Sequence, residues 1–180
     1  MKKYVALLRG INVSGQKKIK MAELREQLKS CGFENIESYI QSGNILFYSV
    51  ESDKTNLQKL ISGQIKSDYG FEVETLVVDP AQLKEWTENN PFIKRGDCDL
   101  SKVYYTMLKE DPSADRLKIL NDVSYPPEEF IISGRIVYLY SPEGAGRAKL
   151  SNNFIESKLK VPATTRNHKT MLKLYEMAVS

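Results

Sequence analysis

Hydrophobic residues recur along the chain in short runs with two different periodicities, and these predict a mixture of strands and helices. Uninterrupted apolar runs, such as 4–8 and 136–140, are typical of buried strands. Between such runs, apolar residues three or four positions apart, as at Met21, Leu24 and Leu28, predict amphipathic helices. The two patterns alternate over the whole length, which indicates a protein that mixes both kinds of element.

The order of the segments predicts the architecture. The first half is expected to be β-α-β-β-α-β, the split βαβ or ferredoxin-like order. After a stretch rich in Pro, Gly, Asn and Asp, the pattern continues as β-α-β-β-α and ends in a helix from about 167 to 178. We therefore predict an α+β protein with antiparallel sheets and packed helices: a ferredoxin-like subdomain at 1–90, a linker at 91–100, and a second α+β subdomain of related plan at 101–180.

This topology also brings two loops together. A right-handed crossover makes the first two strands parallel, so the loop 9–20 and the turn 41–44 are expected at the same edge of the sheet. The loop is basic and contains two glycines, which give its backbone the freedom to turn N–H groups toward an anion. The turn offers amide and hydroxyl groups beside it.

Composition narrows the class of protein. The chain has 180 residues, of which 41% are hydrophobic and 27% charged, as in a globular protein. Its longest apolar runs are five residues, far below the roughly 20 that span a bilayer. Two cysteines without a C-x-x-C pair favour a reducing cytosol, and a single histidine excludes a His-rich zinc site. We expect a cytoplasmic protein with no metal, no cofactor and no membrane partner; its oligomeric state stays open.

The net charge of +3 conceals an uneven distribution. Residues 1–22 contain six bases and no acid, and residues 145–173 contain seven bases and one acid, while the intervening segment is acidic. If folding brings the two basic blocks together, they form a positive surface that suits an anionic partner. The alternative is that each block is a separate solvated face.

Two later segments could join such a surface. Gly144 to Lys149 is a glycine-containing basic loop before a short helix, and 164–170 is expected to open the last helix, where Thr and Asn are ordinary N-caps. Arg166 would oppose the dipole of that helix, which predicts an acidic partner or a bound anion. No catalytic residue is assigned. The candidate ligand-binding residues are Arg9, Asn12, Lys17, Lys20, Gln41, Ser42, Asn44, Arg147, Arg166 and Asn167.

Several chemistries lack the residues they need. A P-loop requires Lys-Ser or Lys-Thr where the chain has Gln16-Lys17 after Gly15. Cys31 lies on an apolar helical stripe, and Cys98 is flanked by aspartates that discourage a thiolate. The segment 44–48 lacks the aromatic pattern of an RNA recognition motif.

Motifs in five places resemble the domain of unknown function 1697 family. They are Leu8-Arg9-Gly10-Ile11-Asn12-Val13 with Gly15, then Lys20-Met21 with Leu24, Tyr39-Ile40-Gln41-Ser42-Gly43-Asn44, and the segments 144–150 and 164–170. The resemblance covers nearly the whole chain and implies a mostly bacterial protein with an α+β fold containing ferredoxin-like elements. It implies no activity. It also implies Trp after Arg166-Asn167, where this chain has His168.

The sequence thus predicts a protein that binds an anionic ligand, either a phosphorylated small molecule or a nucleic acid, at the basic sheet edge. Two alternatives stay open. The first is an enzyme acting on a phosphorylated or carboxylated small molecule, with His168 as the one side chain whose ordinary pKa lies near neutrality. The second is an interaction module whose basic surface meets an acidic protein.

Overall fold

A computed structural model describes all 180 residues, and the chain divides into two compact units. Unit 1 comprises Met1–Lys84 and Leu174–Ser180, and unit 2 comprises Glu85–Lys173. Because unit 1 is built from two separate stretches, the chain leaves it once and returns to it at the end. No helix in the structure is both long and apolar enough to cross a bilayer.

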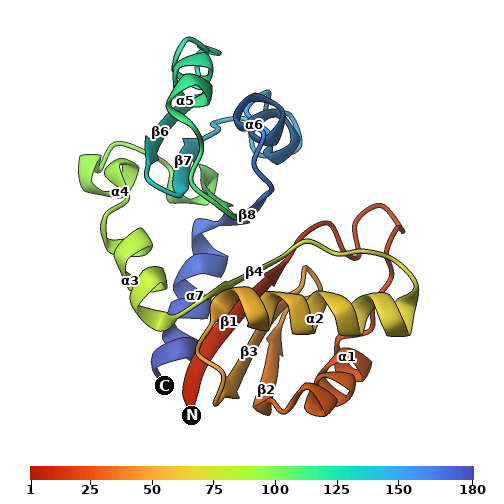
Figure 1. The fold of residues 1–180 in the computed structure, drawn as a ribbon. Helices are drawn as coiled ribbons and strands as arrows, with labels where there is room; N and C mark the ends of the chain where they lie inside the picture. The colour runs from red at the N-terminus through yellow and green to blue at the C-terminus, as the bar shows by residue number, and fades with distance from the viewer. The chain divides into compact units, whose positions relative to one another are not determined.

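Unit 1 has the βαββαβ order that the sequence predicts (Figure 1). Its strands form one antiparallel sheet in the order β2-β3-β1-β4. The elements are β1 (Lys2–Leu8), α1 (Met21–Leu28), the 3-10 helix η1 (Lys29–Cys31), β2 (Glu34–Tyr39), β3 (Asn44–Ser49), α2 (Lys54–Tyr69), β4 (Thr75–Val78) and the start of α3 (Pro80–Glu88).

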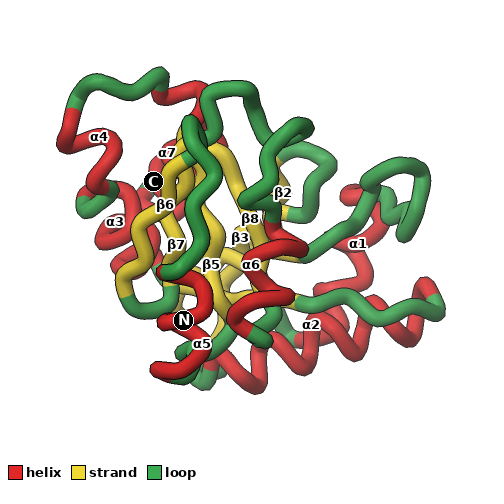
Figure 2. The backbone as a smooth tube through the Cα atoms, turned by 90° about the horizontal axis from the view of Figure 1, so that it is seen from above, coloured by secondary structure: helices red, strands yellow, loops and turns green.

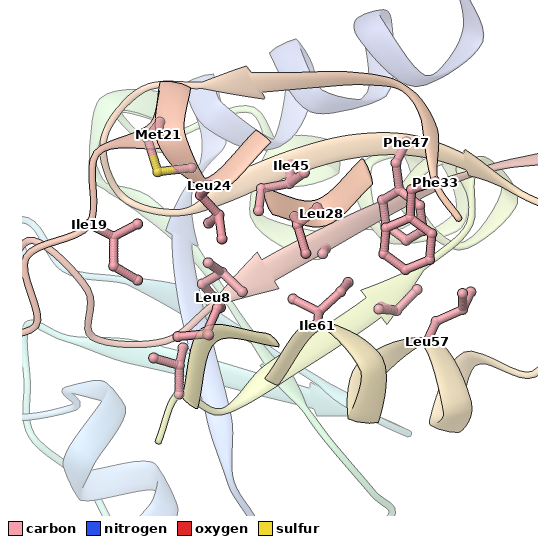
Figure 3. Packing of buried hydrophobic residues seen from close by; sticks show 14 of the residues in the cluster. Leu8, Ile19, Met21, Leu24, Leu28, Phe33, Ile45, Phe47, Leu57 and Ile61 are labelled. Atoms are coloured by element: carbon pink, nitrogen blue, oxygen red, sulfur yellow. The ribbon is translucent and has the colours of Figure 1, made fainter. Parts of the chain in front are cut away.

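The core of unit 1 lies between the sheet and the helices α1 and α2, as Figure 3 shows. Leu24 and Leu28 of α1 and Leu57 and Ile61 of α2 are fully buried there. Burying a side chain of this size contributes roughly 1.5–3 kcal/mol, so the helical stripes noted in the sequence are what hold this layer in place. The rings of Phe33 and Phe47 stack at the far end of this core, with their centroids 4.3 Å apart.

Unit 2 repeats the plan of unit 1, with an antiparallel sheet in the order β6-β7-β5-β8 (Figure 2). The helices α5 and α6 contribute Leu120, Ile155 and Leu159 to a core on one face of this sheet. The elements are α4 (Pro91–Arg95), the 3-10 helix η2 (Leu100–Lys102), β5 (Val103–Leu108), α5 (Ala114–Asn121), β6 (Glu129–Ser133), β7 (Ile136–Tyr140), α6 (Asn152–Leu159), β8 (Ala163–Asn167) and α7 (His168–Val179). The α+β class with antiparallel sheets is therefore confirmed.

The sequence prediction is wrong at β8. Residues 163–167 form a strand paired with β5 instead of the opening of the last helix, which begins at His168. The segment is polar and gives no apolar strand pattern, but the hydroxyl groups of Thr106 and Thr165 lie 2.7 Å apart across the β5–β8 pair. Pairing with a distant strand therefore decides this element, and the second half has the full βαββαβ order.

The segment 91–100, expected to be a linker, lies within unit 2 and contains α4. The Asn90 side chain caps this helix by accepting a hydrogen bond from the Phe92 N–H at 3.0 Å, and Phe92 is fully buried. The division between the units falls instead inside α3, after Lys84, and inside α7, after Lys173.

The two ends of the chain meet in unit 1. The Lys3 ammonium group donates to the Met177 carbonyl oxygen at 2.6 Å and to the Ser180 carbonyl oxygen at 3.4 Å. The first strand and the last turn of α7 are thereby held together.

Candidate functional site

The loop 9–20 and the turn 41–44 lie side by side at one edge of the sheet of unit 1, as the topology predicts. The Leu8 N–H donates to the Gly43 carbonyl oxygen at 2.8 Å. A Cβ on Gly43 would lie 2.6 Å from the Leu8 Cβ and 2.9 Å from the Ile11 Cδ1, so no larger residue fits there. We call the surface formed by these two segments the basic edge.

Asn12 holds the basic edge together. Its amide nitrogen donates to the Ile19 carbonyl oxygen at 2.9 Å and to the Gln41 carbonyl oxygen at 2.8 Å, and its amide oxygen accepts from the Ile19 N–H at 2.9 Å. Its backbone has φ +56°, a left-handed conformation that Asn tolerates better than most residues. Asn12, predicted as a ligand-binding residue, therefore positions the loop in this structure.

The tip of the loop is a tight hairpin. Val13 and Gln16 form an antiparallel bridge, closed by a hydrogen bond from the Gln16 N–H to the Val13 carbonyl oxygen at 3.0 Å. Ser14 and Gly15 between them have φ +50° and +75°. Both residues are exposed, so the turn projects into solvent.

The cationic side chains of the hairpin differ in their surroundings. The Lys17 ammonium group donates to the Glu72 backbone carbonyl oxygen at 2.6 Å. The hydrogen bond from Lys66 is the main cause that lowers the pKa of the Glu72 carboxyl, and the nearby charge of Lys17 adds to it. Lys20 pairs with Glu23 at 2.9 Å, and this hydrogen bond raises the pKa of Lys20. Lys18 is exposed. Arg9 is half-buried at the base of the loop, where its backbone N–H donates to the Glu74 carbonyl oxygen.

In the turn 41–44, some side chains are buried and stabilise the turn, and others are exposed to solvent. Asn44 is fully buried, and its amide nitrogen donates to the Tyr39 carbonyl oxygen at 2.9 Å and to the Ser42 hydroxyl oxygen at 3.1 Å. Gln41 is exposed, and its backbone carbonyl oxygen accepts the hydrogen bond from the Asn12 side chain. Of the predicted residues in unit 1, the exposed Lys17, Lys20 and Gln41 are open to a ligand.

In unit 2, Arg166 lies on strand β8, two residues before α7 begins at His168, so it precedes the helix instead of opening its first turn. Its guanidinium donates to the Thr164 hydroxyl at 2.8 Å and to the Thr165 carbonyl oxygen at 2.9 Å. Only 8% of the residue is exposed, and this burial lowers the pKa of Arg166 to about 10. Asn167 is the N-cap of α7, since its side-chain oxygen accepts from the Thr170 N–H at 2.8 Å.

Arg147 lies on the loop between β7 and α6 and is exposed. It lines a pocket of about 180 Å³ together with Glu128 and Lys149. Arg166 and Asn167 line a different pocket of about 280 Å³, into which Asn152 at the start of α6 also opens. The two pockets adjoin along the loop, since Ser141 and Ala148 line both, but Arg147 does not share a pocket with Arg166.

The backbone of this loop already holds an anionic group of the protein itself. The Glu128 carboxylate accepts hydrogen bonds from the Lys149 N–H at 2.8 Å and from the Leu150 N–H at 2.9 Å. Paired backbone N–H groups of this kind are a typical anion-binding arrangement. Sequence reasoning missed Glu128, because nothing in the pattern links it to a loop about twenty residues later.

Seven of the ten predicted residues thus belong to unit 1, and Arg147, Arg166 and Asn167 belong to unit 2. Convergence of the two groups stays a prediction. Among all described residues, no cluster of three or more His, Cys, Asp or Glu side chains could hold a metal ion.

Residues 1–138 match the family described as "Protein of unknown function (DUF1697)". The chain belongs to this family. It is also similar to the solved structure of a conserved bacterial protein from Streptococcus pneumoniae, with 27% sequence identity, a TM-score of 0.76 and 98% of each chain covered. No curated protein matches the chain in sequence. The resemblance noted in the sequence is confirmed.

Two motifs that carry the DUF1697 resemblance, at 8–13 and 39–44, lie within the matched residues. Their geometry gives a structural reason for several of their residue types. Gly43 lacks space for a side chain, Asn12 joins the two loops, and Asn44 closes the turn. In this DUF1697 chain these positions build the edge that presents the lysines.

The single histidine of this DUF1697 chain is buried in unit 2. The His168 Nδ1 lies 3.0 Å from the Tyr105 hydroxyl, and the two rings stack with an interplanar angle of 10°. Desolvation lowers the pKa of His168, and burial raises the pKa of Tyr105 to about 12. The imidazole therefore favours its neutral form and packs as an aromatic ring, at the position where the sequence resemblance implies Trp.

Both thiols are free. Burial is the main cause that raises the pKa of Cys31, which packs against the core of unit 1. Burial also raises the pKa of Cys98; Asp97 adds to this effect and Arg95 opposes it. The prediction that the setting of Cys98 discourages a thiolate agrees with the direction of its pKa, and Cys31, which lies on an apolar stripe in the sequence, packs against the core.

Proposed function

We propose that this protein binds an anionic ligand at the basic edge of unit 1, with a nucleic-acid backbone as the ligand class. The observation that carries the proposal is the Asn12 amide, which fixes the hairpin 9–20 against the turn at Gln41 through both its nitrogen and its oxygen. A loop held in this way loses little conformational entropy when it binds, and preorganisation of this kind increases affinity.

The charge of the edge supports an anion. The segment from Arg9 to Lys20 carries four bases and no acid. Lys17, Lys18 and Lys20 are all exposed on a projecting hairpin, where they can follow an extended polyanion. Neutralising the phosphates of such a polymer releases condensed counterions, which is the main source of sequence-independent affinity. The exposed Arg147 and Lys149 of unit 2 offer a second set of cations of the same chemistry.

The test is fluorescence anisotropy with labelled single-stranded and double-stranded oligonucleotides, measured between about 50 and 200 mM salt. We expect affinity to fall steeply and linearly on a log–log plot as salt increases. Binding of inorganic phosphate or a nucleoside triphosphate without oligonucleotide binding would restrict the ligand to small phosphorylated molecules. Absence of binding to all of these probes would overturn the proposal.

A charge-matched pair of variants locates the site. Lys18→Glu reverses an exposed charge on the hairpin, and Lys59→Glu reverses an exposed charge on α2, so both change the net charge by the same amount. We expect Lys18→Glu to weaken oligonucleotide binding and to reduce the salt slope by about 1, whereas Lys59→Glu leaves the slope unchanged. Equal effects would mean that net charge and not the basic edge determines binding.

A further inference from the structure

Strand β6 is an unprotected edge of the sheet of unit 2. It lies beside β7 at the end of the sheet (Figure 2). It pairs only with β7, in a regular register over all five residues. Its sequence, Glu-Phe-Ile-Ile-Ser, contains neither lysine nor proline. Natural edge strands usually carry such residues, or a bulge, to prevent pairing with another chain.

The equivalent strand of unit 1 shows what protection looks like in this fold. Strand β2 occupies the same place in its sheet as β6 does, since the orders are β2-β3-β1-β4 and β6-β7-β5-β8. In β2 the register shifts between Glu34 and Glu37, and Asn35 between them has φ +48°. Both glutamates are exposed. One edge is thus bulged and charged, and the other is flat and largely apolar.

The backbone groups that β6 leaves unpaired can be assigned from the neighbouring strands. The Ser141 N–H bonds to the Lys102 carbonyl oxygen, and the Leu108 N–H bonds to the Arg135 carbonyl oxygen, so these residues form hydrogen-bonded pairs between β5 and β7. Because such pairs alternate along an antiparallel ladder, the backbone groups of Phe130 and Ile132 must point away from β7.

A groove of about 570 Å³ is lined by residues 128–132 together with residues of the segment 121–125. Ile131 in the middle of the strand is 39% exposed. The middle of β6 is therefore accessible to solvent and borders an open groove.

We propose that the occupant of this edge is β6 of a second copy of the chain, paired antiparallel about a two-fold axis at Ile131. In this register Phe130 lies opposite Ile132 of the partner subunit, and both residues present their free backbone groups to each other. Aromatic and β-branched residues form favourable cross-strand pairs. The unit 2 sheets of the two copies would then form one continuous sheet.

The charges of the strand suit the same register. Glu129 lies opposite Ser133 of the partner subunit, so no two carboxylates face each other. The Glu129 carboxylate is also neutralised within its own chain, because Arg95 donates to its two oxygens at 2.8 and 2.9 Å. Like charges directly opposite each other would destabilise the pair, and this register avoids them.

The first test is the oligomeric state of the full chain, measured by sedimentation velocity over a range of protein concentrations. We expect a dimer whose population rises with concentration, and its loss in Ile131→Lys, which places two like charges at the axis. Ile119→Lys on α5 is the matched control, because Ile119 is 41% exposed and not on the edge. A monomer at all concentrations, or a dimer that survives in Ile131→Lys, overturns the proposal.

The second test fixes the register in a chain carrying Cys31→Ser and Cys98→Ser. Opposite residues of a pair without hydrogen bonds have Cα atoms about 4.5 Å apart, within disulfide range. Ile131→Cys should therefore form an intermolecular disulfide under mild oxidation. Ser133→Cys should not, because its counterpart lies far along the strand. Equal crosslinking of both variants contradicts the two-fold register at Ile131.

Discussion

The side-chain amide of Asn12 donates a hydrogen bond to the backbone carbonyl oxygen of Gln41 at 2.8 Å and so joins two loops that are 29 positions apart in the chain. The same side chain also exchanges two hydrogen bonds with Ile19 at the other end of the hairpin. From the sequence alone, a polar residue in a glycine-containing basic loop is interpreted as a ligand contact. Here it supplies the rigidity that makes the neighbouring lysines a fixed array.

Removing that amide should loosen the basic edge. We expect Asn12→Ala to lower the free energy of unfolding by about 1–3 kcal/mol, since three hydrogen bonds are lost and alanine is strained at φ +56°. Asn12→Gly removes the same hydrogen bonds without the strain and should be the milder of the two. Urea denaturation measures both. Unchanged stability in Asn12→Ala would show that the amide does not hold the loops together.

Gly43 should tolerate no side chain. Gly43→Ala combines a left-handed backbone, φ +85°, with a Cβ placed 2.6 Å from the Leu8 Cβ. Gly32→Ala is the control, because Gly32 has φ +77° and nothing within 4 Å of its added Cβ. We expect Gly32→Ala to lower the free energy of unfolding by about 1 kcal/mol, and Gly43→Ala to lower it by about 1–3 kcal/mol more than that. Thermal unfolding measures both variants. Equal losses would show that the turn moves to make room.

His168 should make the protein sensitive to mild acid. Desolvation holds the pKa of the folded imidazole below its unfolded value of about 6.5, so the unfolded state binds the proton more readily. The free energy of unfolding should therefore fall as the pH drops below about 6.5 and level off below the folded pKa. His168→Phe keeps a ring beside Tyr105 and should remove this part of the pH dependence. Because the chain has one histidine, NMR titration of its imidazole gives the pKa directly.

The Glu128 carboxylate should be replaceable by an external anion. Glu128→Ala leaves the Lys149 and Leu150 N–H groups without their acceptor, which should cost about 1–3 kcal/mol. We expect sulfate or phosphate to restore part of the melting temperature in this variant, beyond any effect on the unsubstituted protein. Chloride at equal ionic strength is the control. The same response to all salts would show that the loop does not select an oxyanion.

The sequence predicts an element well when that element's own side chains determine it, and poorly when contacts with distant residues determine it. The apolar runs and helical stripes predict β1, α1 and β7 closely, because burial of their own side chains determines these elements. The meeting of loop 9–20 with turn 41–44 follows from topology alone. The strand β8 has no local signal, since its polar residues are held by β5 through contacts such as that between Thr106 and Thr165.

The candidate site shows the same limit. Charge predicts the exposed lysines of the hairpin, since a solvated lysine needs no partner to be placed correctly. Sequence alone does not separate Asn12 and Asn44, which serve the fold, from Gln41, which faces solvent. Nor does it reveal that Arg166 is buried on a strand, because that depends on the pairing of β8 with β5.

The contact between Lys3 and the Met177 carbonyl oxygen has a consequence for truncated variants. Unit 2 spans Glu85–Lys173 without interruption, so removing Leu174–Ser180 takes away none of its residues. The same deletion removes a stretch that belongs to unit 1. A variant that stops after Lys173 would therefore keep every residue of unit 2 and leave β1 without the segment that ties it.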